Sequence, residues 1–365
     1  MKQSFLVIAF ASLSSAVAGA QATARIPLVQ GLTMVSATQL PTGDQENVVT
    51  VSEVSSEGVT YGWSYRQQKG NTVEQGNFRR FVSTGDIASA PRLNPVFFSN
   101  DVDRFPGSTA FSVSRAILAR LKSGGAVTYA LAGIDGAKAG TGWVGANLDG
   151  FLKTRVYMRS TLEKSPSPSG PMSLLINGRR SSVPVVHAIG NFTFRNTKVA
   201  ADFFILDDAE HPLLLRAVTE AGSFQVIRID MPGVNSSIAK NIEADLTAKC
   251  RAEIPGVYFD LASADLKPES NAALDAVARM LNSHADWKLS VEGHTDAVGT
   301  AAGNLALSER RADAVRAALS TRYHVAASRL TASGFGQTKP KESNATVEGR
   351  AHNRRVEMTR PCSRS

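Results

Sequence analysis

The feature that most constrains the fold of this chain is a strand followed by a helix near its C-terminus. We expect a strand at residues 288–295 and a helix at residues 304–323. The helix is predicted because Leu307, Val315 and Leu319 recur on one face at the 3.6-residue period. Arg311 lies four residues from both Leu307 and Val315, so it falls on this apolar stripe.

A guanidinium group on an apolar stripe needs a partner, because burying an uncompensated charge costs several kcal/mol. Asp296, at the end of the preceding strand, is the nearest candidate partner for Arg311 in the pattern. Two interpretations stay open. Asp296 and Arg311 form a structural salt bridge between strand and helix, or they are the two halves of a receptor for a zwitterion.

Four motifs follow one another between about residues 250 and 362, roughly a third of the chain. They are Val257-Tyr258-Phe259-Asp260 with Ala264-Asp265-Leu266-Lys267-Pro268; Gly293-His294-Thr295-Asp296 with N-x-x-L-S-x-x-R-A-x-x-V-x-x-x-L from Asn304 to Leu319; Gly334-Phe335-Gly336 with Pro340; and Glu348-Gly349-Arg350-Ala351-His352-Asn353-Arg354-Arg355-Val356-Glu357. In this order they resemble the motifs of the OmpA-like peptidoglycan-binding domain family.

The coarse order of elements in this segment alternates strand and helix. Strands are expected at 256–260, 288–295, 330–334 and 355–360, and helices at 268–283 and 304–323. Such an order predicts an α/β sandwich with helices on one face of a mixed sheet. The resemblance implies the same fold.

The resemblance also implies a ligand, the diaminopimelate residue in the peptide stem of peptidoglycan. By matching position, Asp296 would accept the ligand's amine and Arg311 would bind its carboxylate. The other residues expected to form the pocket are Thr295, Asn304, Leu307 and Arg355 on its wall and Phe259 and Asp260 on the opposite side. Arg310, Arg316 and Arg354 are expected to be surface charges.

The N-terminus resembles a secretory signal peptide. Lys2 precedes an apolar run over residues 5–18, and small residues follow at 16–20. We expect a signal peptide at residues 1–20, with cleavage somewhere in 18–24. No cysteine lies near this region, so a lipid anchor is not expected. No later segment approaches 18 continuous apolar residues, so no transmembrane helix is expected.

The net charge of +8 favours contact with polyanions. An exported protein rarely meets nucleic acid, so no nucleic-acid partner is expected. Anionic envelope components suit the compartment better. The expected location is the periplasm, in association with the outer membrane and the cell wall. The expected partners are peptidoglycan and either the outer membrane or an outer-membrane protein.

Two cysteines, Cys250 and Cys362, bracket the C-terminal segment. An even, low count at domain edges in an oxidising compartment favours a disulfide. The bridge would close a loop of about 110 residues and contribute ~4–5 kcal/mol in the chain-entropy model, as an upper figure. The alternative is two unpaired buried thiols.

Residues 25–233 are expected to be a β-rich periplasmic domain of unknown role. Val59, Tyr61, Trp63 and Tyr65 alternate with smaller or polar residues, as in a half-buried strand. Asn177-Gly178 predicts a hairpin, and a helix is expected at 112–121. Further strands are expected at 28–37, 48–54, 127–134, 155–159, 173–176, 183–189, 203–206, 213–218 and 224–229. Short strands and few aromatic residues favour a soluble domain over a membrane barrel.

The sequence contains none of the common catalytic motifs, such as a P-loop, G-x-S-x-G or H-E-x-x-H. We therefore expect no enzyme activity, no cofactor and no metal. Asp207-Asp208-Ala209-Glu210-His211-Pro212 contains metal-ligand residue types, but consecutive acidic residues before proline are ordinary turn chemistry. His187, in an apolar run, is expected to be a satisfied core histidine.

Between the two parts, residues 234–249 are expected to form a helical linker with Ile238, Ile242 and Leu246 on one face. The expected fold class is α+β overall. A β-rich N-terminal domain is followed by an OmpA-like α/β sandwich with a mixed sheet at 250–362.

The function predicted from these features is a non-catalytic envelope protein that binds the peptidoglycan peptide stem without covalent attachment. It would tether the wall to the outer membrane or to a partner. One alternative is a ligand- or lipid-carrying β-domain targeted to the wall by the C-terminal module. Another is a component of an envelope machine.

Overall fold

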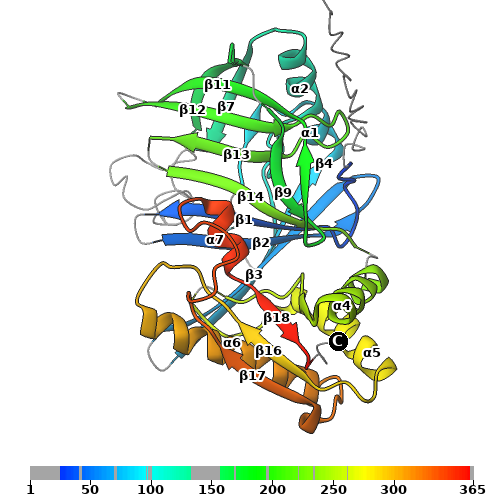
Figure 1. The fold of residues 1–365 in the computed structure, drawn as a ribbon. Helices are drawn as coiled ribbons and strands as arrows, with labels where there is room; N and C mark the ends of the chain where they lie inside the picture. Colours follow the sequence, from blue (N-terminus) through cyan, green and yellow to red (C-terminus); the bar gives the residue numbers. More distant parts are fainter. Residues whose placement is uncertain are drawn as a thin grey trace, which may run out of the picture.

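The computed structural model describes residues 25–40, 43–69, 72–95, 97, 101–132, 157–167, 170–194, 197–220, 222–232, 235–260 and 262–361. The expected signal peptide lies outside these residues. The described chain is organised around two sheets (Figure 1). We call residues 25–232 the N-terminal region and residues 250–361 the C-terminal region.

The N-terminal region is built on one large sheet. Its strands are β1 (Thr33–Leu40), β2 (Gly43–Val54), β3 (Gly58–Lys69), β4 (Thr72–Ser83), β5 (Arg92–Leu93), β6 (Val102–Arg104), β7 (Val127–Ala132), β8 (Tyr157–Lys164), β9 (Met172–Ile176), β10 (Arg179–Val183), β11 (Val185–Phe194), β12 (Thr197–Leu206), β13 (Leu214–Thr219) and β14 (Gly222–Asp230).

Most neighbours in this sheet are antiparallel. The order is β5-β7-β8-β11-β12-β13-β14-β1-β2-β3-β4-β6, with β9 paired to β14 and β10 paired to β9. Two short helices, α1 (Thr84–Ser89) and α2 (Arg115–Lys122), accompany the sheet. Its core contains fully buried aromatic side chains such as Tyr61, Tyr129 and Phe203. The β-rich prediction for this region is confirmed.

The predicted hairpin at Asn177-Gly178 is confirmed. It joins β9 to β10, and both residues have positive φ, 51° and 75°. Two positive φ values in a two-residue loop are the signature of a type I′ turn. The predicted helix at 112–121 is present as α2, which begins at Arg115 after Ser114.

The strand β4 was not predicted. Its sequence, with adjacent Arg79 and Arg80 and a glycine at 76, has no clear alternation of apolar and polar residues. It forms because β3 pairs with it in register from Gly58↔Ser83 to Lys69↔Thr72. A long antiparallel ladder overrides a weak local strand propensity.

The C-terminal region contains a four-stranded mixed sheet in the order β15-β18-β16-β17. Only β16 and β17 are parallel. The elements from residue 235 onward are α4 (Asn235–Lys249), β15 (Arg251–Glu253), η2 (Pro268–Ser270), α5 (Asn271–Ser283), β16 (Leu289–Gly293), α6 (Ala301–Thr321), η3 (Ala327–Arg329), β17 (Leu330–Gly334), α7 (Val347–Asn353) and β18 (Val356–Thr359). The predicted α+β class and mixed sheet are confirmed.

One apolar core serves the sheet and the helices α4, α5 and α6. Leu246 of α4, Leu274 of α5 and Val315 of α6 are all completely buried in it, together with Val291 of the sheet. The helix predicted as a linker therefore contributes to the C-terminal core. Among the described residues, no helix is long and apolar enough to span a membrane.

Two details of the predicted C-terminal order are wrong. Residues 256–260 are not a strand, because Pro255 and Gly256, whose φ is +81°, turn the chain; the first strand is β15 instead. Phe259 retains only an isolated bridge to Leu266. The helix α7 was also missed, because it has only seven residues, near the lower limit for periodicity to be visible.

The two regions contact each other directly. The helix α7 lies against the N-terminal strands near β14 (Figure 1). A small apolar cluster crosses the boundary and contains Val35, Ala37, Val48 and Ile227 from one side and Tyr258 and Ala351 from the other. Side-chain hydrogen bonds join the same surfaces, including Gln225 Nε2 to Glu348 Oε1 at 2.6 Å.

Candidate functional site

Asp296 lies in the loop between β16 and α6. The loop is held from both ends. The Thr300 side chain caps α6 by accepting a hydrogen bond from the Gly303 N–H, and the Asn304 amide donates to the backbone oxygens of Asp296 and Val298 at 3.2 and 3.1 Å. Asp296 Oδ1 accepts from the Val298 N–H at 3.0 Å. These contacts fix the position of the carboxylate.

Glycines allow α6 to lie directly on the strand ends. A Cβ atom at Gly293 would come within 2.1 Å of the Ser308 backbone oxygen, and one at Gly334 within 2.4 Å of the Glu309 nitrogen. Ser308 also accepts a hydrogen bond from the Gly336 N–H at 2.8 Å. This close packing places the middle of α6, and so Arg311, beside the Asp296 loop.

Arg311 has few partners. Its Nε donates to the Ser263 backbone oxygen at 2.9 Å, and its guanidinium carbon lies 4.8 Å from the centroid of the Phe259 ring. In the part of the chain that the structure describes, its two terminal nitrogens have no hydrogen-bond or ion-pair partner. Burial lowers the pKa of Arg311 to about 10, with Arg354 and Arg310 adding to the effect and Glu46 and Asp296 opposing it.

The partner of Asp296 is Arg354, not Arg311. Asp296 Oδ2 lies 2.5 Å from Arg354 Nη1, while Arg354 Nη2 lies 2.6 Å from Glu46 Oε1 of strand β2. Of the two interpretations left open, the structural salt bridge between Asp296 and Arg311 is therefore not formed. The prediction that Arg354 is a surface charge is wrong, since only 14% of its side chain is exposed. Burial alone lowers the pKa of Arg354, but Glu46 and Asp296 outweigh it and raise the pKa above its ordinary value.

Thr295 and Asn304 support the loop. The Thr295 N–H donates to the Gly336 oxygen at 3.0 Å, and its hydroxyl donates to the Asp296 oxygen at 2.9 Å. The Asn304 amide also donates to Gln337 Oε1 at 2.8 Å. Both side chains are buried, so their geometry suits positioning of Asp296.

The remaining predicted site residues divide into two groups. Phe259 and Arg355 line a cavity that Arg311 also lines. Asp260 is instead paired with Lys267 at 2.7 Å, with both side chains buried. Leu307 is half-buried on α6 and does not line this cavity.

The cavity lies at the boundary between the two regions and has a volume of about 50 Å³. From the C-terminal region it is lined by Phe259, Arg311, Arg354 and Arg355, and from the N-terminal region by residues including Val35, Glu46 and Val48. Its lining therefore combines aromatic and basic side chains on one side with apolar side chains, Glu46 and Arg228 on the other.

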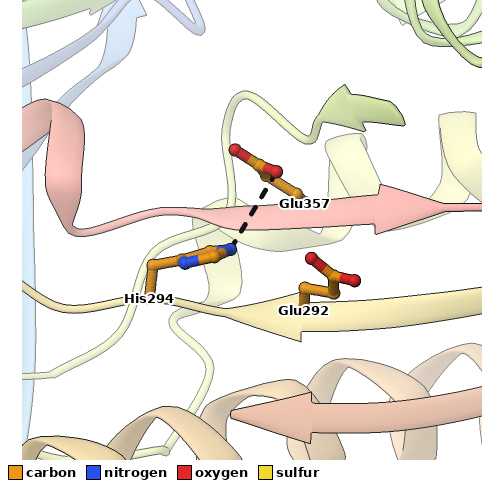
Figure 2. A group of neighbouring side chains, drawn as sticks. All are labelled: Glu292, His294 and Glu357. Carbon is orange, nitrogen blue, oxygen red and sulfur yellow. Dashed lines mark ion pairs between the residues drawn. The ribbon is translucent and has the colours of Figure 1, made fainter. Parts of the chain in front are cut away.

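A second polar cluster lies on the sheet and joins Glu292, His294 and Glu357 (Figure 2). Each of the three residues offers one atom that could bind a metal ion, and these three atoms lie within 4.8 Å of one another. Arg251 contacts both carboxylates, at 3.1 Å for Glu292 and 3.0 Å for Glu357. Because guanidinium groups already neutralise both acids, a cation would have to displace an arginine. We interpret the cluster as an ion-pair network that joins β15, β16 and β18.

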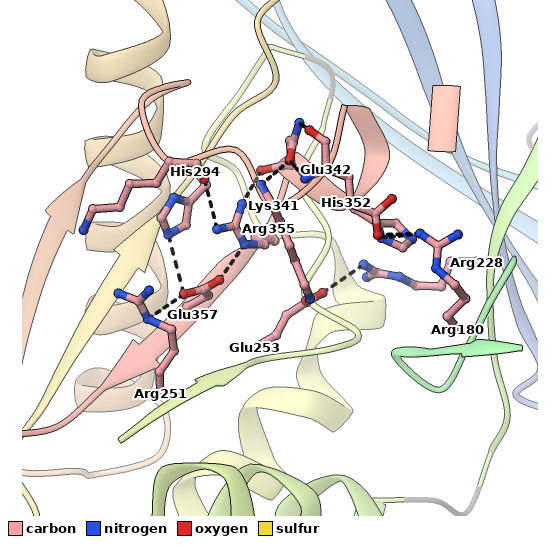
Figure 3. A network of polar contacts seen from close by, with 12 residues as sticks. Arg180, Arg228, Arg251, Glu253, His294, Lys341, Glu342, His352, Arg355 and Glu357 are labelled. Atoms are coloured by element: carbon pink, nitrogen blue, oxygen red, sulfur yellow. Dashed lines mark hydrogen bonds and ion pairs between the residues drawn. The ribbon is translucent and has the colours of Figure 1, made fainter. Parts of the chain in front are cut away.

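Arg355 belongs to the same network (Figure 3). Its Nε donates to Glu357 Oε1 at 2.6 Å. Burial tends to raise the pKa of Glu357, but the hydrogen bond and charge of Arg355 lower it below the ordinary value. Burial, with Arg355 close by, lowers the pKa of His294 to about 4, so this imidazole is neutral at pH 7.

The residues at 207–212 form a turn between β12 and β13. Lys122 Nζ lies 2.5 Å from Asp207 Oδ1, and the Asp208 carboxylate accepts from the backbone N–H of Glu210 at 2.9 Å. This agrees with the turn prediction. His187 lies 2.6 Å from Asp202 and stacks on Phe204 at 4.5 Å, as expected of a satisfied histidine.

Sequence reasoning missed Arg354 and Glu46. The sequence around Arg354 and Arg355 has no periodic pattern of apolar residues, so it does not indicate whether either arginine is buried. Glu46 lies in β2, which is distant from Arg354 in sequence, and nothing local indicates its contact with Arg354. Only the packing of the two regions brings them together.

The fold and this site define an OmpA-like domain. A four-stranded mixed sheet is covered by helices, an aspartate follows the first strand of the parallel pair, and an arginine on the next helix faces an aromatic ring.

A family model described as "OmpA family" matches residues 258–354. The peptidoglycan-associated lipoprotein of Pseudomonas aeruginosa is 38% identical over 126 residues, which cover 34% of this chain and 73% of that protein. This chain therefore belongs to the OmpA family through its C-terminal region.

Outer membrane porin F of the same organism is 46% identical over 101 residues, which cover 28% of this chain and 29% of that protein. The match thus spans less than a third of porin F. A crystal structure of the peptidoglycan-associated lipoprotein from Burkholderia pseudomallei is 35% identical. It covers 29% of this chain and 88% of that chain, with a TM-score of 0.27.

Proposed function

We propose that this protein is a non-catalytic envelope protein that binds peptidoglycan without covalent attachment through its C-terminal region. It would tether the cell wall to the outer membrane or to a partner protein. The family membership and the name of the peptidoglycan-associated lipoprotein support the class of ligand. The Asp296 and Arg311 geometry supports the finer proposal, recognition of the diaminopimelate residue.

The observation that carries this proposal is the state of Arg311. It faces Phe259, and its terminal nitrogens have no partner among the described residues. A guanidinium binds a carboxylate through two parallel N–H groups, and these are the atoms left without a partner here. The lowered pKa of Arg311 indicates that its buried surroundings disfavour the positive charge, which an incoming carboxylate would stabilise.

Asp296 supplies the complementary half. Its carboxylate is held by the Val298 N–H and by Arg354, yet each carboxylate oxygen can accept more than one hydrogen bond. An ammonium group could therefore bind it without breaking either contact. A ligand with an amine and a carboxylate on one carbon, as at the far end of diaminopimelate, presents both groups together.

We extend the proposal to the organisation of the chain. Residues 1–20 would be a signal peptide cleaved somewhere in 18–24, residues 25–233 a β-rich periplasmic domain, residues 234–249 a helical linker and residues 250–362 the wall-binding domain. The protein would lie in the periplasm, associated with the outer membrane and the wall.

The test is sedimentation of the exported chain with purified peptidoglycan of two chemical types. One carries diaminopimelate in its stem, and the other carries lysine, which lacks the second carboxylate. We expect binding to the first and much weaker binding to the second. Arg311→Ala should remove this preference, whereas Arg310→Ala, the same change at an exposed neighbour, should preserve it. Absence of binding by a folded chain would refute the proposal.

A further inference from the structure

The N-terminal region covers the site that we assign to the wall peptide. Val35, Glu46 and Val48 line the cavity opposite Phe259, Arg311 and Arg354. The cavity of about 50 Å³ is far below the ~300–1,000 Å³ typical of ligand pockets. A peptide stem therefore cannot enter while the two regions are packed as the structure shows them.

One contact between the two regions joins a carboxylate to a guanidinium, as the proposed contact with the ligand would. Glu46 Oε1 lies 2.9 Å from Nε and 2.6 Å from Nη2 of Arg354, so a carboxylate accepts two bonds from one guanidinium. The same guanidinium binds Asp296. Glu46 is also the strongest charge that opposes the lowering of the Arg311 pKa, which places its carboxylate in the field of Arg311.

We propose that Glu46 is an internal competitor of the wall ligand, and that the site opens only when the N-terminal region moves away from it. This inference rests on the proposed function and adds a regulatory contact to it. The carboxylate of Glu46 neutralises the basic side of the pocket in the closed state, and the ligand's carboxylate takes over that role in the open state.

The contacts that hold the closed state are mainly individual polar bonds. Arg228 lies 3.7 Å from Glu253, and Arg180 forms an ion pair with Glu342 (Figure 3). Lys267 donates to the Ser64 backbone oxygen at 2.7 Å. Among the described residues, the apolar cluster that crosses the boundary is small. Interfaces of this kind between domains commonly permit relative movement.

The energetic consequence is a reduced apparent affinity. When only a fraction of molecules is open, the apparent dissociation constant rises by the inverse of that fraction. Removing the charge of Glu46 weakens a charge-assisted contact of the closed state. We therefore expect the Glu46→Gln chain to bind the wall peptide about tenfold more tightly than the native chain.

The experiment is calorimetric titration of the full exported chain with a soluble disaccharide-peptide fragment that contains diaminopimelate. Glu53→Gln is the matched control, because Glu53 lies exposed on the same strand β2 and forms no ion pair among the described residues. It should bind like the native chain. The double variant Glu46→Gln with Asp296→Asn should not show the tighter binding, because Asp296→Asn removes the carboxylate proposed to bind the ligand's amine.

A second measurement uses the native chain alone. Small-angle X-ray scattering should show a larger radius of gyration when the fragment is bound than when it is absent. If Glu46→Gln bound the fragment as tightly as the native chain or more weakly, or if the radius of gyration did not change on binding, Glu46 would not be a competitor of the ligand. The proposal of wall binding would still stand. No binding by either chain would instead refute the proposed function.

Discussion

Asp296 and Arg354 form an ion pair, with 2.5 Å between Oδ2 and Nη1. Both side chains are nearly buried, with 10% and 14% exposed. The pair fixes the carboxylate of the proposed amine site and leaves Arg311 outside it. Under the proposed function, stability depends on Arg354 and ligand binding on Arg311, and this separation can be tested.

The first prediction concerns ligand affinity. Asp296→Asn and Arg311→Ala should each weaken binding of the diaminopimelate peptide by about tenfold to over a hundredfold. Each change removes a charge-assisted bond worth roughly 1.5–3 kcal/mol. Calorimetric titration of the full chain measures the loss. Amidating the ligand's carboxylate should harm the native chain much more than the Arg311→Ala chain, and equal sensitivity would exclude carboxylate binding by Arg311.

The second prediction concerns stability. Arg354→Ala should lower the free energy of unfolding by ~3–5 kcal/mol, because it leaves Asp296 buried without its partner. Arg311→Ala should change it by no more than about 1 kcal/mol, since Arg311 makes one side-chain hydrogen bond and no ion pair among the described residues. Urea unfolding distinguishes the two. A large loss in Arg311→Ala would assign Arg311 a structural role.

Much of the C-terminal fold was predictable from the sequence. The helix α6 follows from the apolar period of its residues, and the aspartate loop follows from its motif. Both signals are local, because the residues that carry them lie within the element itself. The strand prediction at residues 256–260 was wrong because the apolar side chains there pack against the core, while the backbone forms only an isolated bridge.

The electrostatics of the site could not be predicted in the same way. Whether Asp296 meets Arg311 or Arg354 depends on side-chain directions at three separate segments. Glu46 enters from β2, more than two hundred residues away, and no pattern in either segment encodes that contact. Long-range polar contacts depend on how whole surfaces pack, which a single sequence does not reveal.

The third prediction concerns the limits of the wall-binding unit. A segment starting at residue 235 should be more stable than one starting at residue 250, and both should sediment with diaminopimelate-type peptidoglycan when folded. The shorter segment lacks Ile238, Ile242 and Leu246, which α4 buries in the C-terminal core. Each such side chain contributes roughly 1.5–3 kcal/mol. Thermal unfolding compares the two, and equal stability would show that α4 packs without contributing.

The fourth prediction is an intramolecular disulfide between Cys250 and Cys362. Cys362 lies outside the described residues, so the bond is a proposal. It is supported by strand pairing, since the Arg360 N–H donates to the Cys250 oxygen at 3.0 Å and Cys362 follows two residues later. Mass spectrometry of exported protein without reductant should find a mass two hydrogens below the dithiol. Thiols that alkylate in native material would contradict it.

The last prediction is a pH dependence that arises from His211. Its Nδ1 donates to the Ile26 backbone oxygen at 3.0 Å, and burial lowers its pKa from 6.5 to about 4. A histidine with a depressed pKa takes up its proton more readily in the unfolded chain. Its contribution to stability is therefore complete above pH 6.5 and is lost as the pH falls towards 4.

At pH 5 the loss should reach about 2 kcal/mol relative to pH 7.5. His211→Gln removes this titration while keeping a side chain that can donate to Ile26. The variant is expected to be less stable than the native chain at pH 7.5, but its unfolding free energy should fall less on acidification. Urea unfolding at the two pH values gives the comparison. An equal fall in both chains would show that His211 does not titrate over this range.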